Sequence, residues 1–442
     1  MDKLKIIYYL IGFYLKRIKT RKQLSEFRKI KLQQLEKFLL RHSPYYSDQI
    51  AYNGGLLHLP IINKSEYFKN FNEINTVKVN YDQAMEIALK SEQSRDFSPM
   101  IGDIAVGLSS GTSGNRGLFI TSANERARWV AAMIFKVIGW KWKKRNIAFF
   151  LRSNNQLYEQ SNSGLIRFNF FDLSESFDTL LLRLNKLKPD ILIAQPSVLV
   201  AVCKAINSGS VQIKPGKVIS VAEVLESDVR MLLTKTFGQV IHEVYQCTEG
   251  FLACTCSEGK LHMNEDLVFF QERYLDEEMK RFHPIITDFS RKSQPMVRYE
   301  LNDVLTYSDD KCACNSPFRI IEKIEGRADD VLIFEHKIHE EHVYVFGDFI
   351  RRVMLYADQE ELIQNYQVHQ ISPDHLKISL NVKNNVEIIE AAILIHFNKY
   401  CTDNDLKMPE IEFDDIINFD PMKKFRRITR APFHLTDKIN YL

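Results

Sequence analysis

The sequence has little of what marks several specialised protein classes. Its 17 Gly and 13 Pro among 442 residues are too few for a collagen-like or low-complexity chain. The formal net charge is only +3, so the overall charge does not point to nucleic acid as a partner. No apolar run approaches the roughly 20 residues that a membrane-spanning helix needs. The 45% hydrophobic and 26% charged residues are ordinary for a folded protein, and the length suggests two to four domains at roughly 100–200 residues each.

A short apolar run, from Ile6 to Leu15, lies near the start of the chain. No small-residue cleavage site follows it, and a basic stretch does, which argues against a secretory signal. Four of the seven Cys fall in the close pairs Cys254/Cys256 and Cys312/Cys314, which suits a reduced compartment better than a disulfide scaffold. We therefore expect a cytoplasmic protein.

The first 45 residues concentrate positive charge. They hold twelve Lys or Arg and three acidic residues, a local net charge of +9. Between residues 4 and 42, apolar positions recur at helical spacing with basic residues between them, and Ser43-Pro44 is a sound helix stop. We expect a basic helical segment over residues 1–45. It packs on its own domain, makes weak peripheral contact with a membrane through residues 1–42, or binds a partner protein.

Short apolar runs alternate with helical stretches between residues 100 and 330, which predicts an α/β architecture. An amphipathic helix is expected at 124–138, an extended stretch at 296–306 and a turn at 312–317. Beyond Gly326 the pattern changes to strand–helix units, as in a small C-terminal domain of about 110 residues. The expected strands are 104–108, 118–122, 146–151, 191–194 and 217–221.

Five islands of polar residues lie in or beside these elements. The first is the loop 108–117, LSSGTSGNRG, in which small residues and hydroxyls can wrap an anion, although it lacks the GK[ST] of a P-loop. The others are Ser220-Val221-Ala222-Glu223, the stretch 245–250 (YQCTEG), the stretch 298–303 (RYELND) and the stretch 326–330 (GRADD).

The order and content of these islands resemble the adenylate-forming (ANL) superfamily. The resemblance covers nearly the whole chain and is strongest to the phenylacetate-CoA ligase-like branch, and within it to adenylate-forming enzymes related to the synthetases that adenylylate a deazaflavin cofactor. Residues 60–64 and 91–96 also fit. The resemblance implies an α/β fold with a large N-terminal domain of mixed sheets, residues 46–328, and a small mobile C-terminal α+β lid, residues 329–442.

The resemblance also implies a nucleotide site for ATP with Mg²⁺. Tyr245 would stack on adenine, Asp303 would accept bonds from the ribose hydroxyls, Thr248 would bond a phosphate and Glu249 would hold Mg²⁺. Ala222 and Glu223 would edge the adenine pocket. The residues that would cradle the phosphates are Ser109, Ser110, Gly111, Thr112, Ser113 and Gly114.

Charge near the phosphates would come from Arg327, and Asp329 would be the hinge of the small domain. The catalytic lysine of the small domain would be Lys424, because Arg427 follows at the family's spacing of three; Lys423 with Arg426 also fits.

The sequence departs from the family pattern at two places. Arg116-Gly117 replaces the usual Pro-Lys pair of the phosphate loop. The strand after the hinge, residues 331–337, lacks the usual glycine of the pantetheine tunnel, which weakens the expectation of CoA more than that of adenylation.

The cysteines suggest a second site. Two Cys separated by one residue in a turn can both point to one cation, and three Cys with one His form a normal structural zinc set. Phenylacetate-CoA ligase-like proteins often keep such an arrangement, so the expected Zn²⁺ ligands are Cys256, His262, Cys312 and Cys314, with Cys254 as a competing ligand. Cys203 and Cys401 lie among apolar residues and are expected in the core.

Three functions compete at this point. The leading one is an acid–thiol ligase, which activates a small carboxylic acid as an acyl-adenylate, releases pyrophosphate and transfers the acyl group to CoA or a carrier protein. The second is an adenylyltransferase that leaves AMP on its substrate. The third is a catalytically weak nucleotide-binding scaffold at a membrane surface. The sequence does not identify the acid, because its pocket is built from scattered positions.

Overall fold

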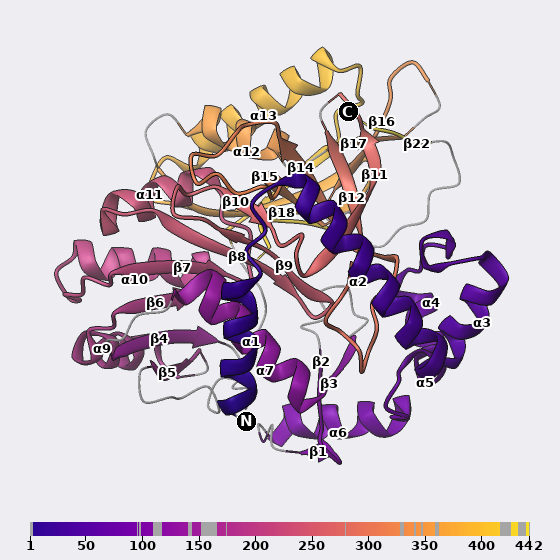
Figure 1. Ribbon diagram of the computed structural model, residues 1–442. Helices are drawn as coiled ribbons and strands as arrows, with labels where there is room; N and C mark the ends of the chain where they lie inside the picture. The colour runs from indigo at the N-terminus through magenta and orange to yellow at the C-terminus, as the bar shows by residue number, and fades with distance from the viewer. Residues whose placement is uncertain are drawn as a thin grey trace.

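The computed structural model describes residues 3–94, 96, 99–108, 117–139, 144–151, 166–173, 175–278, 280–327, 331–339, 342–345, 348–358, 362–415, 426–431 and 439–441. Most of the chain forms a large α/β body, and the C-terminal part forms a smaller layer against one side of it (Figure 1). No helix in the described ranges is both long and apolar enough to cross a membrane.

Helices form the first part of the chain. The predicted 4–42 segment is helical but broken in two, since α1 (Lys3–Leu15) ends before α2 (Arg21–His42), whose first turn is capped by Thr20. Ser43 ends α2 and also caps α3 (Pro44–Asn53). Pro44 is then the first residue of α3, a position that suits proline because its missing N–H would have no partner there. The following short elements are η1 (Leu56–His58), α4 (Lys64–Lys69), α5 (Phe71–Ile74) and α6 (Tyr81–Ser94).

The N-terminal helices share the core of the large body. Leu10, Leu35 and Leu39 are buried in the same apolar cluster as the central strands. Helix α1 packs along α7 (Ala123–Met133), which continues as the π-helix η2 (Ile134–Ile138). Of the three alternatives given for residues 1–45, packing on the chain's own domain is therefore seen for the described residues of this segment.

Parallel strands form one half of the main sheet, in the order β5, β4, β6, β7, β8. Alternate residues of β4 face opposite ways: Ile147 and Phe149 enter the core shared with α7, whereas Ala148 and Phe150 enter a second core under three helices. Burial on both faces explains why these strands read as continuous apolar runs. The elements are β4 (Arg145–Leu151), β5 (Ile166–Asp172), β6 (Ile191–Ala194), β7 (Lys217–Val221), β8 (Ile241–Cys247), α9 (Phe177–Leu187), α10 (Pro196–Asn207) and α11 (Ser227–Phe237).

The other half of this sheet is antiparallel and continues from β8 in the order β9, β10, β15, β14, β12, β11. With β13, which pairs with β12 off this path, the described strands make one mixed sheet of twelve. The predicted extended stretch 296–306 contains β13 and the start of β14. The predicted turn 312–317 lies in the connection between β14 and β15. These strands are β9 (Gly250–Thr255), β10 (Leu261–Met263), β11 (Val268–Asp276), β12 (Arg281–Asp288), β13 (Tyr299–Glu300), β14 (Asp303–Ser308) and β15 (Ile320–Arg327).

A small separate sheet holds the two strands predicted on either side of the Ser/Gly-rich loop. Strand β1 (Met100–Ile101) pairs with β2 (Ile104–Leu108), and β2 pairs antiparallel with β3 (Leu118–Thr121). Leu108 lies opposite Leu118, so the two ends of the loop start side by side.

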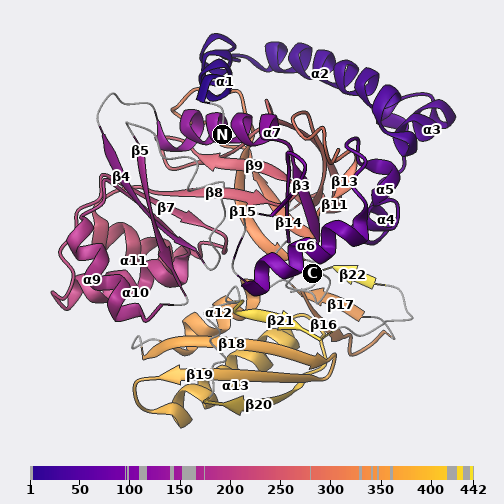
Figure 2. The same ribbon diagram turned by 90° about the horizontal axis from the view of Figure 1, so that it is seen from below.

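The C-terminal part has a core of its own, running from Leu332 to Ile428. Figure 2 shows its strands and α13 on the side of the molecule opposite α1 and α2. The expected hinge at Asp329, and with it the boundary 328/329, lies outside the described residues. The elements are β16 (Leu332–Glu335), β17 (His342–Val345), α12 (Asp348–Ala357), β18 (Ile363–Ser372), β19 (His375–Val382), α13 (Val386–Asp403), β20 (Glu410–Asp414), β21 (Ile428–Arg430) and β22 (Ile439–Tyr441).

Candidate nucleotide site and metal cluster

A tight turn follows β7 at the carboxyl edge of the parallel strands. Ala222 has φ +68°, and the Glu223 N–H donates to the Val221 carbonyl over 2.9 Å. A hydrogen bond that spans only three residues, with a positive φ at the central one, defines a strained type of γ-turn. Ligands of open α/β sheets bind beyond this edge, and backbone strain tends to gather at such sites.

The Glu223 carboxylate lies at the start of α10. Its Oε2 accepts a bond from the Ser197 N–H over 3.3 Å, at the second residue of this helix. The negative charge is favourable there because the first backbone N–H groups of a helix lack partners and carry partial positive charge. Glu223 thus holds the start of α10, and it also lies where the edge of the adenine pocket is expected.

Tyr245 and Asp303 come together although 58 positions separate them. Tyr245 lies near the end of β8, Asp303 begins β14, and the Tyr245 hydroxyl donates to Asp303 Oδ2 over 2.5 Å. Burial, followed by the charge of Asp303, raises the pKa of Tyr245 well above its usual value. The phenol therefore stays protonated and keeps donating, which fixes the orientation of the Asp303 carboxylate.

These residues line one cavity of about 440 Å³, within the roughly 300–1,000 Å³ range of small-molecule sites. Ala222, Glu223, Tyr245 and Asp303 all contribute to its wall. The cavity lies between the two parts of the chain, because the C-terminal part also contributes. The wall residues from that part are Gln364, Asn365, Asn381, Arg426, Arg427 and Ile428.

Two hydroxyls in this wall are without partners among the described residues. Ser197 Oγ and Ser220 Oγ are buried and make no hydrogen bond there. A buried hydroxyl left unpaired costs roughly 1–3 kcal/mol. A ligand with polar edges, such as adenine with its ring nitrogens and amino group, could satisfy both.

Thr248 and Glu249 lie in the turn between β8 and β9, where the Thr248 hydroxyl donates to Glu249 Oε2 over 2.9 Å. They are not in the wall of the 440 Å³ cavity, but they lie close to it. The pKa of Cys247, between them and Tyr245, is raised by burial and then by the charges of Glu249 and Asp303. Both carboxylates therefore act on the same short stretch of β8.

A basic residue that the sequence analysis did not select holds this turn. Arg291 donates through Nη1 to the Thr248 carbonyl and through Nη2 to Gln294 Oε1, the second over 2.8 Å. Arg291 lies just before the predicted extended stretch 296–306. The sequence carried no signal for this contact, because 43 positions separate Arg291 from Thr248.

Several expected site residues fall outside the described residues: the phosphate loop Ser109, Ser110, Gly111, Thr112, Ser113 and Gly114, with Arg116, Asp329, Lys423 and Lys424. For Arg327 the structure gives the backbone alone. Arg327 pairs opposite Asp303 in the register of β14 and β15, which places its backbone beside the cavity.

Arg427 links the C-terminal part to the large body. Its guanidinium lies over the Tyr366 ring, 4.9 Å from the centroid, and Nη1 lies 3.3 Å from Asp228 Oδ2 in α11. Desolvation opposes the positive charge, but Tyr366 and Asp228 outweigh it, and the pKa of Arg427 rises above its usual value. The sequence pattern indicates for Arg427 only the spacing that selects Lys424.

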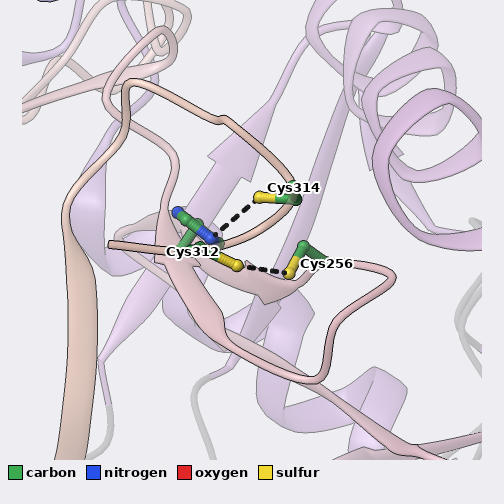
Figure 3. Close-up of side chains that lie close together, drawn as sticks. Cys256, Cys312 and Cys314 are labelled. Carbon is green, nitrogen blue, oxygen red and sulfur yellow. Dashed lines mark hydrogen bonds between the residues drawn. The ribbon is translucent and has the colours of Figure 1, made fainter. Parts of the chain in front are cut away.

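The four expected zinc ligands converge. Cys256 follows β9, His262 lies in β10, and Cys312 and Cys314 lie in the turn between β14 and β15. Their ligand atoms all lie within 4.8 Å of one another. Figure 3 shows the Cys256, Cys312 and Cys314 side chains turned toward a common point.

The distances within this cluster fit a tetrahedral ion. Cys256 Sγ lies 3.6 Å from Cys312 Sγ, and Cys314 Sγ lies 3.4 Å from His262 Nε2. Bonds of about 2.3 Å to sulfur and about 2.0–2.1 Å to nitrogen place tetrahedral sulfurs roughly 3.8 Å apart, and sulfur and nitrogen roughly 3.6 Å apart. His262 Nδ1 lies 2.9 Å from the Phe318 carbonyl, a contact that directs the proton to Nδ1 and leaves Nε2 for an ion.

Cys254 is not a member of this cluster. Its sulfur lies 3.6 Å from Asn264 Oδ1, and burial raises its pKa to about 11, so the thiol stays protonated. Cys203 and Cys401 are buried among apolar side chains, as expected.

Comparison with known proteins adds evidence on the fold. No family model matches the sequence, and no curated protein matches it. Among solved structures, 2-hydroxyisobutyryl-CoA ligase in its post-adenylation state, in complex with 2-HIB-AMP, aligns over 93% of this chain and 89% of its own. The TM-score is 0.67, at 15% sequence identity.

The chain has the fold of the adenylate-forming enzymes. Two further proteins with this fold align over 73% of the chain, each with a TM-score of 0.51. The amide bond synthetase McbA from Marinactinospora thermotolerans is 15% identical over 67% of its own length, and the anthranilate CoA ligase AuaEII, in complex with anthranoyl-AMP, is 16% identical over 66%. The predicted α/β class, with a large N-terminal and a smaller C-terminal domain, is confirmed. The proposed branch and the deazaflavin link remain predictions.

Proposed function

We propose that this protein is an adenylate-forming ligase that uses ATP to activate a small carboxylic acid as its acyl-adenylate, with release of pyrophosphate. The observation that carries the proposal is the 440 Å³ cavity, whose wall joins Ala222, Glu223, Tyr245 and Asp303. These residues were selected from separate islands of the sequence. Their meeting in one cavity at the carboxyl edge of β7 and β8 is what a nucleotide site requires.

In this proposal the adenosine part of ATP occupies the cavity. Adenine stacks on Tyr245, with the Ala222–Glu223 turn along its edge and the Ser197 and Ser220 hydroxyls on its polar groups. Asp303 accepts hydrogen bonds from both ribose hydroxyls. Its carboxylate is suited to this role because the Tyr245 hydroxyl already fixes its orientation. The phosphates extend toward residues 109–114, with Arg327 and Thr248 beside them.

Glu249 is the proposed ligand of Mg²⁺, a cation that prefers carboxylate oxygens and neutralises phosphate charge. Its carboxylate lies in a turn at the end of β8 and is held by the Thr248 hydroxyl. Arg291 fixes the same turn through the Thr248 carbonyl. The residues thus fit a metal site beside the phosphates.

The C-terminal part is the proposed lid, rotating about Asp329 and bringing Lys424, or Lys423 one position earlier, to the α-phosphate. The contact of Arg427 with Asp228 supports an adenylation-competent arrangement, because it docks this part over the cavity. The overall similarity agrees: the TM-score to 2-hydroxyisobutyryl-CoA ligase is 0.67 in the post-adenylation state and 0.51 in the thioesterification state. Lys424 and Asp329 enter this proposal from the sequence resemblance.

The Cys256, His262, Cys312 and Cys314 cluster is the proposed site of one structural Zn²⁺. Four ligands at tetrahedral spacing leave no open position for chemistry. A bound ion would tie the β9–β10 hairpin to the turn between β14 and β15, the strand pair that carries Asp303 and Arg327.

The acceptor of the acyl group is proposed to be a thiol, of CoA or of a carrier protein. 2-Hydroxyisobutyryl-CoA ligase has been solved in complex with 2-HIB-AMP and CoA, and it shares the fold. An acid panel with hydroxylamine trapping identifies the acid. Addition of CoA then yields a thioester if the proposal holds, whereas a product that retains AMP would identify an adenylyltransferase.

A further inference from the structure

Helix α1 presents apolar side chains on two faces, and only one is covered. Leu10 is buried, and Ile6, Tyr9 and Phe13 pack against the core with it. The uncovered face repeats at helical spacing along the whole helix. Its members and their exposed fractions are Leu4 77%, Ile7 48%, Tyr8 72%, Ile11 52% and Leu15 79%.

The charge around this stripe has one sign. The chain contains no Asp or Glu from Lys3 to Ser25. The exposed cations of the same stretch, apart from the ion-paired Arg21, flank the stripe at both ends of α1 and continue to the first turn of α2: Lys3, Lys5, Lys16, Arg17, Lys19 and Lys22.

Cations from other segments gather on the covered side of α1, around Tyr9. Lys31 of α2 lies close enough to Lys16, Arg128 of α7 and Lys292 that all three lower its pKa, after burial. Arg128 lies 6.0 Å from the centroid of the Tyr9 ring, so the group adjoins α1 directly. Asp288 offsets part of the Arg128 charge. Bringing four cations together is unfavourable unless an anion accompanies them.

We propose that α1 lies flat on an anionic lipid bilayer, with its exposed apolar stripe among the acyl chains and its surrounding Lys and Arg on the acidic headgroups. The exposed apolar face and the cationic border are what an interfacial helix needs. A second copy of the chain would fit less well, because pairing two stripes would bring two cationic borders together.

This orientation leaves the C-terminal part free to move. Helices α1 and α2 lie on one side of the large body, and β18, β19, β20 and α13 lie on the opposite side (Figure 2). A bilayer under α1 would not contact that layer. We centre the membrane contact expected from residues 1–42 on α1 and its border, since Arg21 and Arg28 of α2 already pair with Glu265.

The test is flotation of the full chain with vesicles, and it does not depend on catalysis. We expect binding to vesicles of phosphatidylcholine with about one-third phosphatidylserine, weak binding to phosphatidylcholine alone, and loss of binding in about 0.5 M NaCl. The double variant Ile7→Asp/Ile11→Asp should lose binding. Lys16→Glu/Arg17→Glu should weaken it by roughly tenfold or more.

A matched control places the same change elsewhere. Leu182→Asp/Met231→Asp alters two apolar side chains that are 73% and 68% exposed on α9 and α11, and it should bind as the unaltered chain does. A Tyr8→Trp variant should show a blue-shifted emission with anionic vesicles. Equal flotation of the Ile7/Ile11 variant, or no shift for Tyr8→Trp, would overturn the proposal. So would a concentration-dependent dimer that the Ile7/Ile11 variant abolishes without vesicles.

Discussion

Ala222 shows at the scale of one residue how the site is held. A side chain in the left-handed region costs roughly 1–2 kcal/mol, and the Glu223–Val221 hydrogen bond keeps it there. Ala222→Gly relieves this strain but adds entropy to the unfolded chain, so we expect a net gain of about 0.5–1 kcal/mol. Thermal unfolding should show a rise of roughly 0.5–1 °C.

A second alanine of the same cavity provides the comparison. Ala201 lies inside α10, where glycine costs about 1 kcal/mol, so Ala201→Gly should lower the unfolding temperature instead. A fall of similar size in both variants would mean that the turn at Ala222 is not strained.

His242, on β8, adds a dependence on pH. Burial, and then the charge of Lys217, lowers its pKa to about 4 from an ordinary value near 6.5. Between pH 4 and pH 6.5, His242 is protonated in the unfolded chain but stays neutral in the folded chain. Stability from this group is therefore complete above about pH 6.5 and is lost as the pH falls toward 4.

His242→Gln should therefore lose less stability than the unaltered protein when the pH falls from about 7 to about 5. The measurement is the urea midpoint at the two pH values. Part of the slope should remain, because burial also lowers the pKa of His283 and His369. Parallel pH profiles for the two proteins would show that His242 does not titrate in this way.

Among the elements, those with a strong local pattern could be predicted from the sequence. Strands 191–194 and 217–221 match β6 and β7, and the two strands around the Ser/Gly-rich loop match β2 and β3 apart from one residue. The break between α1 and α2 was missed, because basic residues there continue the helical spacing. The cavity residues from β18 and β19, such as Asn365 and Asn381, carried no signal, since only the packing of the C-terminal part brings them to the site.

The zinc cluster joins elements that are distant in sequence, so its test belongs to this scale. We expect about one Zn²⁺ per chain in protein purified without chelator. Cys312→Ser should lose the metal and lower the unfolding temperature by several degrees, because binding energy at such a site is folding energy. Metal content and thermal unfolding measure the two effects.

Cys254→Ser is the matched variant, since Cys254 is near the cluster but outside it. It should retain full zinc. Loss of zinc in Cys254→Ser with retention in Cys256→Ser would reverse the assignment of the ligands, and the absence of zinc from the unaltered protein would remove the site.

At the scale of the whole molecule, the C-terminal part is expected to supply a cation for adenylation and then to rotate. Lys424→Ala should slow adenylate formation by about 10²–10³-fold, as for loss of one preorganised stabilising group. ATP binding, and the reaction of a preformed acyl-adenylate with a thiol, should change little. Single-turnover assays of each half-reaction provide the measurement.

Two further variants help to explain that result. Lys423→Ala tests which of the two lysines acts. If Lys423→Ala slows adenylate formation and Lys424→Ala does not, the catalytic lysine is Lys423. Asp228→Asn weakens only the docking contact with Arg427, in which the Asp228 carboxylate is exposed, so it should slow adenylate formation no more than about fivefold. Normal rates in both lysine variants would require another cation.

Pyrophosphate exchange measures whether the cavity and its acidic turn form an ATP-dependent, acid-activating site. With a panel of carboxylic acids, we expect exchange of labelled pyrophosphate into ATP that depends on Mg²⁺ and on one class of acid. Glu249→Ala should reduce that exchange by orders of magnitude, because the proposed metal ligand is lost. Exchange without any acid would show that the site does not activate an acid, and near-normal exchange by Glu249→Ala would show that Glu249 is not the metal ligand.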